Sequence, residues 1–410
     1  MRWLQNNDTS PGVISSGARR SVDKEVEPVI RFFSRLPGRL VPFDGEALHC
    51  LVPLSRRGDG HKSLHSLSYG AYLGAIEKFV SKHVNQMESI VGGSISAIDV
   101  ISEKHGSDYH PARLEVTSDA GTRALVVNVA FTERGRTRLI HEMEVLQLLA
   151  AKGDRRFLPE VYFSGEQRAT GEGDRPVLID MFIGEWLEGF HEFHLTSDPG
   201  AGLRPIAVWD TDHGTTFISA QEAKEIYRQA AFVLTYYYDI DTFAEIYPWH
   251  HAAGDFVVSR SDGKVEVRLI SARQYAPRIG AADTLEHRIE GLLLFFANLT
   301  VRMRLDRFDG VGEIAWAGDY CLDGAIQGFF DAMQDRASCD RSVSQLWASA
   351  LNVAAHMSPD GWAEVFSFTA DSYPDDAPDA PLIRDNLVKH ILRVYRQVPN
   401  FARTERHRLS

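Results

Sequence analysis

Residues 241–275 have the sequence DTFAEIYPWHHAAGDFVVSRSDGKVEVRLISARQY, and the rest of the chain is organised around them. A helical pattern over 221–238 leads into this stretch, and Pro248 disfavours helix at the residue before it. An apolar run, a turn at Ser261-Asp262-Gly263 and an alternating run then predict a β-hairpin over 256–269. The stretch therefore predicts a helix, a polar loop and a hairpin, in that order.

The polar loop contains His250, His251 and Asp255. Two imidazoles and a carboxylate are groups that bind metals or move protons near neutral pH. We therefore take His250 and His251 as candidate catalytic residues and Asp255 as a candidate metal ligand. A hydrogen-bonded or solvated loop without any chemistry is the alternative interpretation of all three.

The composition is that of a globular protein. The chain has 410 residues, of which 44% are hydrophobic, so it can bury a large core and is expected to form two or three lobes. A formal net charge of -12 argues against nucleic acid as a partner, because phosphate contacts need clustered basic residues. Three widely spaced cysteines and the lack of any apolar run of membrane-spanning length predict a cytoplasmic protein with no membrane partner.

The order of elements predicts an α+β protein in three parts. Residues 1–90 form an arm and extension with one helix over 69–90, residues 91–184 a β-rich lobe, and residues 185–410 a helical lobe with an embedded hairpin. The β-rich lobe is expected to contain an antiparallel meander at 95–103, 112–117 and 123–131, a helix at 137–151, and strands at 159–165 and 177–182. The helices of the last part are predicted at 221–238, 284–304, 322–333, 342–357 and 382–398.

This order resembles that of the protein-kinase-like superfamily, in particular its aminoglycoside-phosphotransferase-like and lanthionine-synthetase dehydratase-like branches. Several short sequences support the resemblance: HEMEVLQLL at 141–149, LIDMFIGEWLEG at 178–189, GDFVV at 254–258 and SDYHPAR at 107–113. The resemblance implies a two-lobed fold, with a small antiparallel β lobe and a larger, mainly helical lobe, preceded here by an N-terminal extension. Residues 184–189 would be the hinge between the lobes.

The resemblance also implies a nucleotide site. Glu142 matches the helix glutamate of the family, Glu185 lies in the hinge that would face an adenine, and Asp255 matches a metal-binding asparagine. Asn128 stands where the family has its phosphate-binding lysine, so we place it with Glu142 and Glu185 among the cofactor-binding residues.

Two further positions depart from the family pattern. His250 stands where the family has its catalytic aspartate, and Ser271 replaces a metal-binding aspartate. Phosphoryl transfer depends on a cation at the phosphates and on ligands for Mg²⁺, and a serine hydroxyl is a poor substitute for a carboxylate around that ion. Nearby arginines can supply the missing charge, and the sequence does not choose among Arg113, Arg123, Arg134 and Arg136.

Three functions remain open from the sequence. The first is an atypical phosphotransferase that uses ATP and Mg²⁺ on a small molecule or a peptide. The second is a catalytically inactive pseudokinase that binds or scaffolds a protein partner. The third is a transition-metal site built from the loop histidines, because imidazole suits zinc, iron or copper better than magnesium. A histidine pair at His191 and His194 is a weaker metal candidate, because the sequence marks no third ligand.

Overall fold

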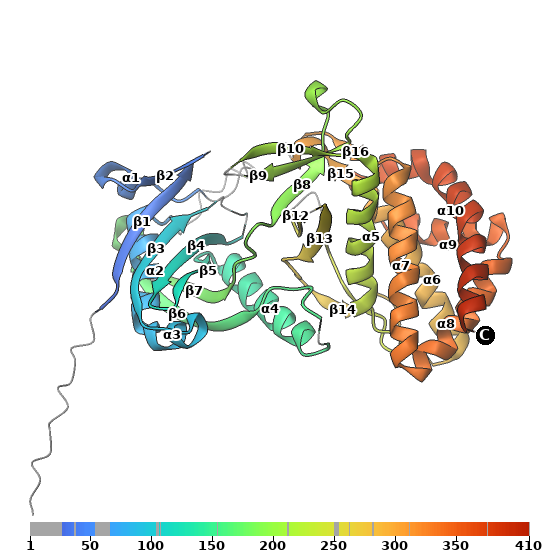
Figure 1. Ribbon diagram of the computed structural model, residues 1–410, viewed down its shortest axis with the longest axis horizontal. Coiled ribbons are helices and arrows are strands. Elements are labelled where there is room, and N and C mark those ends of the chain that lie inside the picture. Colours follow the sequence, from blue (N-terminus) through green and yellow to red (C-terminus); the bar gives the residue numbers. More distant parts are fainter. Residues whose placement is uncertain are drawn as a thin grey trace, which may run out of the picture.

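The protein is an α+β structure in which a large sheet lies at one end and a group of helices at the other, with a second sheet between them (Figure 1). Among the described residues, no helix is both long and apolar enough to cross a membrane. The computed structural model describes residues 27–36, 38–53, 66–103, 106, 108–153, 155–210, 213–249, 254–261, 263–280, 283–310, 312–374 and 376–409.

The large sheet has seven strands in the order β2-β1-β3-β4-β5-β7-β6. The predicted antiparallel meander is confirmed, because β4 pairs antiparallel with both β3 and β5. The strands are β1 (Val29–Leu36), β2 (Arg39–Pro42), β3 (Ile95–Ser102), β4 (His110–Ser118), β5 (Gly121–Ala130), β6 (Val161–Thr170) and β7 (Pro176–Glu185).

The first 90 residues contain more structure than the single helix that the sequence predicts. β1 pairs in parallel with β3, and β2 pairs antiparallel with β1, so both strands extend the large sheet. Parallel neighbours are joined by a long crossover, and this non-local pairing leaves no local signal in the sequence. The crossover contains α1 (Gly45–His49), α2 (Tyr69–Lys82) and α3 (Val84–Val91), and α2 buries Tyr72, Ile76 and Phe79 in the core of this part.

Helix α4 (Glu133–Ala150) connects the two halves of the core. The Thr132 side chain caps its first turn by accepting a hydrogen bond from the Gly135 N–H at 3.0 Å. Leu139 packs with residues of the large sheet, whereas Leu146 belongs to the core of the helical part. Its two ends therefore hold the sheet and the helices in one arrangement.

The second sheet has five strands in the order β10-β9-β8-β12-β13, and the predicted hairpin β12–β13 is present. Three of the strands correct the sequence interpretation, which expects only that hairpin after residue 185. Each has five residues, which is too short to show a clear alternating pattern. The strands are β8 (His191–Leu195), β9 (Ile206–Asp210), β10 (Gly214–Ile218), β12 (Phe256–Ser261) and β13 (Lys264–Leu269).

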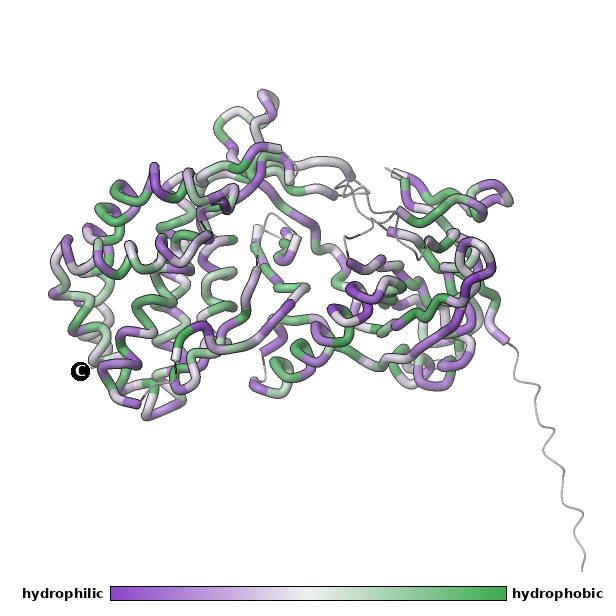
Figure 2. The backbone as a smooth tube through the Cα atoms, turned by 180° about the vertical axis from the view of Figure 1, so that it is seen from behind, coloured by the Kyte–Doolittle hydropathy of each residue, from purple (hydrophilic) through white to green (hydrophobic). Residues whose placement is uncertain are grey.

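The remaining residues are mainly helical. All five predicted helices are present. The helices over 220–237 and 319–339 pack closely because Gly324 and Gly328 have no side chain. An added Cβ at these two positions would lie 2.3 and 2.0 Å from backbone oxygens of the facing helix. Figure 2 shows hydrophobic and hydrophilic residues alternating along these helices, as expected for helices with one buried face. The helices are α5 (Ala220–Tyr237), α6 (Leu285–Met303), α7 (Asp319–Cys339), α8 (Arg341–His356), α9 (Pro359–Asp371) and α10 (Ala380–Leu409).

Helix α9 and two short ribbons are absent from the sequence prediction. The start of α9 has a recognisable signal, because Ser358 caps it and Pro359 occupies its first turn. Tyr238 and Phe295 are buried in the core and stack on each other with 4.2 Å between ring centroids. The ribbons are β11 (Ala244–Ile246) with β14 (Tyr275–Pro277), and β15 (Leu305–Arg307) with β16 (Ile314–Trp316).

Candidate functional site

Asp255 lies directly before β12 and is held by a bidentate ion pair. Its side chain is 1% exposed, and both of its oxygens accept hydrogen bonds from the two terminal nitrogens of Arg273, each at 2.5 Å. Burial lowers the pKa of Arg273, but the Asp255 carboxylate outweighs that effect and leaves the pKa raised. The carboxylate that the sequence assigns to a metal is therefore neutralised by an arginine two residues after Ser271.

Glu142 is the second buried carboxylate of the site, and α4 carries it inward. It is 4% exposed, and its Oε1 accepts hydrogen bonds from the Ser271 Oγ at 2.5 Å and from the Ala272 N–H at 2.9 Å. Its Oε2 accepts a hydrogen bond from the Tyr109 hydroxyl. Burial raises the pKa of Glu142 although these donors oppose the shift.

These residues form two adjacent hydrogen-bonded groups, one in which Tyr109 and Ser271 donate to Glu142 and one in which Arg273 donates to Asp255, and their charges interact. We call the two groups together the Glu142–Asp255 cluster. Burial and the neighbouring Glu142 carboxylate raise the pKa of Tyr109 well above its usual value, so the phenol stays protonated and donates. The cluster joins the loop before β4, the helix α4 and the segment after β13. It contains two carboxylates and one guanidinium, held by short charge-assisted hydrogen bonds.

Asn128 does not join the cluster. It lies on β5, opposite Pro111 of β4 and Phe182 of β7, and its side chain is half-buried. With Asn128 in place of the family's lysine, the resemblance leaves Glu142 as either a hydrogen-bond partner of Asn128 or an exposed helix residue. Neither is correct, because within the described part of the chain Glu142 is buried and accepts its hydrogen bonds from Tyr109, Ser271 and Ala272.

Glu185 has a bracing role at the end of β7. Its Oε2 accepts a hydrogen bond from the Glu160 N–H at 3.2 Å, and its own N–H donates to the Glu160 carbonyl at 2.8 Å. These two bonds fasten the end of β7 to the segment before β6. The carboxylate at the expected hinge is thus already engaged with the protein backbone.

The two candidate catalytic histidines, His250 and His251, lie outside the described residues. The residue before them, Trp249, is buried, and its carbonyl accepts a hydrogen bond from Arg302 of α6 at 2.6 Å. The chain therefore enters the polar loop from a well-held position.

The other predicted candidates lie elsewhere. His194 contacts Asp306 at 3.4 Å and Glu192 at 3.8 Å, whereas His191 lies 3.5 Å from Asp210, so the two imidazoles have different carboxylate partners. His110 is buried on β4, where it stacks on Phe131. No group of three or more metal-ligating side chains occurs among the residues that the structure describes.

None of the four arginines that the sequence offered as substitute cations reaches Glu142. Each of them forms an ion pair or a hydrogen bond with another side chain: Arg113 with Glu115, Arg123 with Tyr162, Arg134 with Asp108, and Arg136 with Asp180. The cation of the site is Arg273, which the sequence interpretation missed. Its position in the segment LISAR, next to the strand that pairs with β12, is the only local signal that could have pointed to it.

No family model matches the chain, and no curated protein matches it either. The function must therefore be argued from the chemistry of the site. That chemistry is a cluster of two buried carboxylates, a phenol, a hydroxyl and one guanidinium.

Proposed function

We propose that this protein is a catalytically inactive kinase-like protein, a pseudokinase that works as a binding or scaffolding module. The order of elements supports the kinase-like part of the proposal. From β3 to β7 the chain forms a meander, a helix and two further strands, and a helix and a hairpin follow at α5 and β12–β13, as the resemblance implies. The short strands β8, β9, β10 and β11 are additional to that order. Order alone supports a fold, whereas function has to be argued from the site.

The ion pair between Asp255 and Arg273 is the observation on which the loss of catalysis rests. A Mg²⁺ ligand must present free carboxylate oxygens, and both oxygens of Asp255 are occupied by a guanidinium at 2.5 Å. A dication and a guanidinium compete for the same two oxygens. The residue with the best match to a metal ligand is therefore not available as one in this arrangement.

The neighbouring residues strengthen the argument. Ser271 replaces a second metal ligand, and its hydroxyl donates to Glu142 instead. Asn128 brings no charge to the place of a phosphate-binding lysine, and Glu142 already accepts three hydrogen bonds from the protein. The described residues do not fit Mg²⁺ with ATP.

One observation favours the alternative, an atypical phosphotransferase. The side chain of Arg273 is 39% exposed, so a guanidinium is present at the surface of the site. This chain lacks the phosphate-binding lysine of the family, and Arg273 would supply a cation in its place. Arginine binds phosphate oxygens in a bidentate manner, as it binds the carboxylate here. In this alternative a phosphate group would draw Arg273 away from Asp255 and free that carboxylate.

Calorimetric titration separates the two functions. ATP is titrated with and without Mg²⁺ into the wild-type chain, into Asp255→Ala and into Arg273→Gln, after circular dichroism has established that each variant is folded. A pseudokinase of the proposed kind gives no Mg²⁺-dependent ATP binding in any of the three. Mg²⁺-dependent binding by the wild type that disappears in Asp255→Ala would establish the phosphotransferase site and refute the proposal.

A further inference from the structure

A second site lies away from the Glu142–Asp255 cluster, in a cavity of about 170 Å³ between α6, α9 and the β11–β14 ribbon. Its walls are mainly apolar and aromatic, and Phe368 of α9 stands at its mouth with 59% of its surface exposed. An apolar cavity of roughly 150 Å³ is large enough to bind benzene. The cavity therefore has room for one aromatic ring with a short substituent.

Glu245 of β11 is the charged group of this cavity. It is 5% exposed, and its Oε1 accepts one hydrogen bond from the Arg278 Nη1 at 3.3 Å, which is long for a charged pair. Its Oε2 accepts no hydrogen bond from any residue that the structure describes. A ligand inside the cavity that donates to this oxygen would add a charge-assisted hydrogen bond.

Arg278 makes a second contact besides the one to Glu245. Its side chain is 30% exposed, and its guanidinium lies 4.0 Å from the ring centroid of Tyr247, which supplies a separate cation–π contact. Arg278 can therefore keep the Tyr247 contact while a second donor takes the open oxygen of Glu245.

The charged state of Glu245 depends on what fills the cavity. Burial raises the pKa of Glu245 to about 7, although Arg278 and the more distant Arg302 of α6 oppose that shift. Tyr238 of α5 faces the same carboxylate, and burial keeps its phenol protonated. A cation inside the cavity would stabilise the ionised carboxylate.

The aromatic wall of the cavity lies close to α6. Phe243 has a left-handed backbone with φ of 59°, which few residues other than glycine adopt, and its ring lies over Gly291 of α6. An added Cβ at position 291 would lie 2.5 Å from that ring, so the glycine makes room for it. Phe243 and Phe295 present aromatic surface to the cavity, and such surface favours a flat ring and a cationic group.

We propose that this cavity binds a small aromatic amine, with its ammonium group donating to Glu245 and its ring packed against Phe243 and Phe295. Charge-assisted hydrogen bonds to a carboxylate are stronger than those from neutral donors. The buried acid selects the cation, and the cavity size limits the ligand to about one ring. This site is independent of the proposed pseudokinase function.

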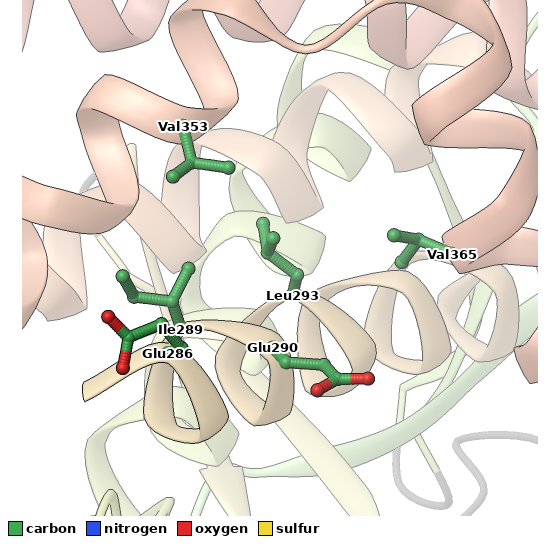
Figure 3. Close-up of a pocket in the computed structure, with 6 residues that line it drawn as sticks. All are labelled: Glu286, Ile289, Glu290, Leu293, Val353 and Val365. Carbon is green, nitrogen blue, oxygen red and sulfur yellow. The ribbon is translucent and has the colours of Figure 1, made fainter. Parts of the chain in front are cut away.

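A neighbouring cavity provides a comparison. It has a volume of about 240 Å³ and lies on the other side of α6, where α8 and α9 contribute Val353 and Val365 (Figure 3). Its only acidic groups, Glu286 and Glu290, are exposed at its rim and stay solvated. It therefore lacks the buried carboxylate that would select an amine.

The test uses three probes of one size and different charge, which are benzylamine, benzyl alcohol and benzoate. Each is titrated into the full-length chain at about pH 8, above the pKa of Glu245, and binding is followed by ligand-observed NMR. We expect saturable binding of benzylamine, weaker binding of benzyl alcohol and none of benzoate. The absence of saturable benzylamine binding, or tighter binding of benzoate, would overturn the proposal.

Variants locate the site. Glu245→Gln keeps the shape of the side chain and should weaken benzylamine binding by about tenfold or more, the loss expected for one charged hydrogen bond. Leu294→Trp fills the cavity and should abolish binding, whereas Val365→Phe fills the neighbouring cavity and should leave it unchanged. Equal binding by wild type and Glu245→Gln refutes the assignment, and the probe series on the wild type decides if a variant fails to fold.

Discussion

Removing the guanidinium of Arg273 should destabilise the fold, because the buried carboxylate of Asp255 loses its bidentate cation. Asp255 is 1% exposed and receives two hydrogen bonds of 2.5 Å from Arg273. Loss of one partner of a fully buried pair costs about 3–5 kcal/mol. Since 39% of the Arg273 side chain is exposed, water screens part of this interaction. We therefore expect Arg273→Gln to lower the free energy of unfolding by about 2–3 kcal/mol.

A double-mutant cycle measures the interaction itself. Urea unfolding is followed by fluorescence and by circular dichroism for wild type, Arg273→Gln, Asp255→Asn and the double variant. A free energy of unfolding is calculated for each protein whose fluorescence and circular dichroism transitions coincide. The double variant should lose at least about 1 kcal/mol less than the sum of the single losses.

The matched control is Arg268→Gln on the neighbouring hairpin. Arg268 pairs with Glu266, whose side chain is largely exposed, so its loss should cost under about 1 kcal/mol. If Arg273→Gln costs no more than this control, or if the losses in the cycle add within about 0.5 kcal/mol, the pair is not the stabilising contact that we describe.

Two further predictions concern the dependence of stability on pH. Because burial raises the pKa of Glu245 from 4.5 to about 7, its contribution to stability is complete below pH 4.5 and is lost as the pH rises through 7. Glu245→Gln should therefore gain about 3 kcal/mol relative to wild type across that interval in urea unfolding, and parallel profiles would contradict the assignment. Burial alone lowers the pKa of His194, but Asp306 and Glu192 raise it from 6.5 to about 8. The contribution of the protonated imidazole to the free energy of unfolding is therefore complete below pH 6.5 and is lost as the pH rises through 8. In Asp306→Asn the imidazole should titrate at a lower pH by NMR, and about 2 kcal/mol of that pH-dependent stability should disappear; an unchanged titration would exclude Asp306 as the cause.

The elements predicted correctly are those with a strong local pattern. The meander β3–β5, the helix α4 and the hairpin β12–β13 each form from consecutive residues, so alternation, helical periodicity and turn residues predict them. The sequence names two acidic residues of the candidate site on other grounds. Asp255 stands in the polar loop before the hairpin, and Glu142 is identified by its match to the helix glutamate of the kinase-like family.

The sequence by itself determined the α+β class, the order of the main elements and the acidic residues of the site, because each of these depends on neighbours along the chain. Only the tertiary structure decided that β1 joins β3 in parallel, that β8 pairs with β12, and that Arg273 neutralises Asp255. These contacts join segments that are distant in sequence, or side chains whose direction depends on packing. The strands pair because pairing buries whole faces of the sheets, and Arg273 pairs with Asp255 because a buried carboxylate needs a cation. No local sequence pattern encodes which strand or which cation becomes the partner.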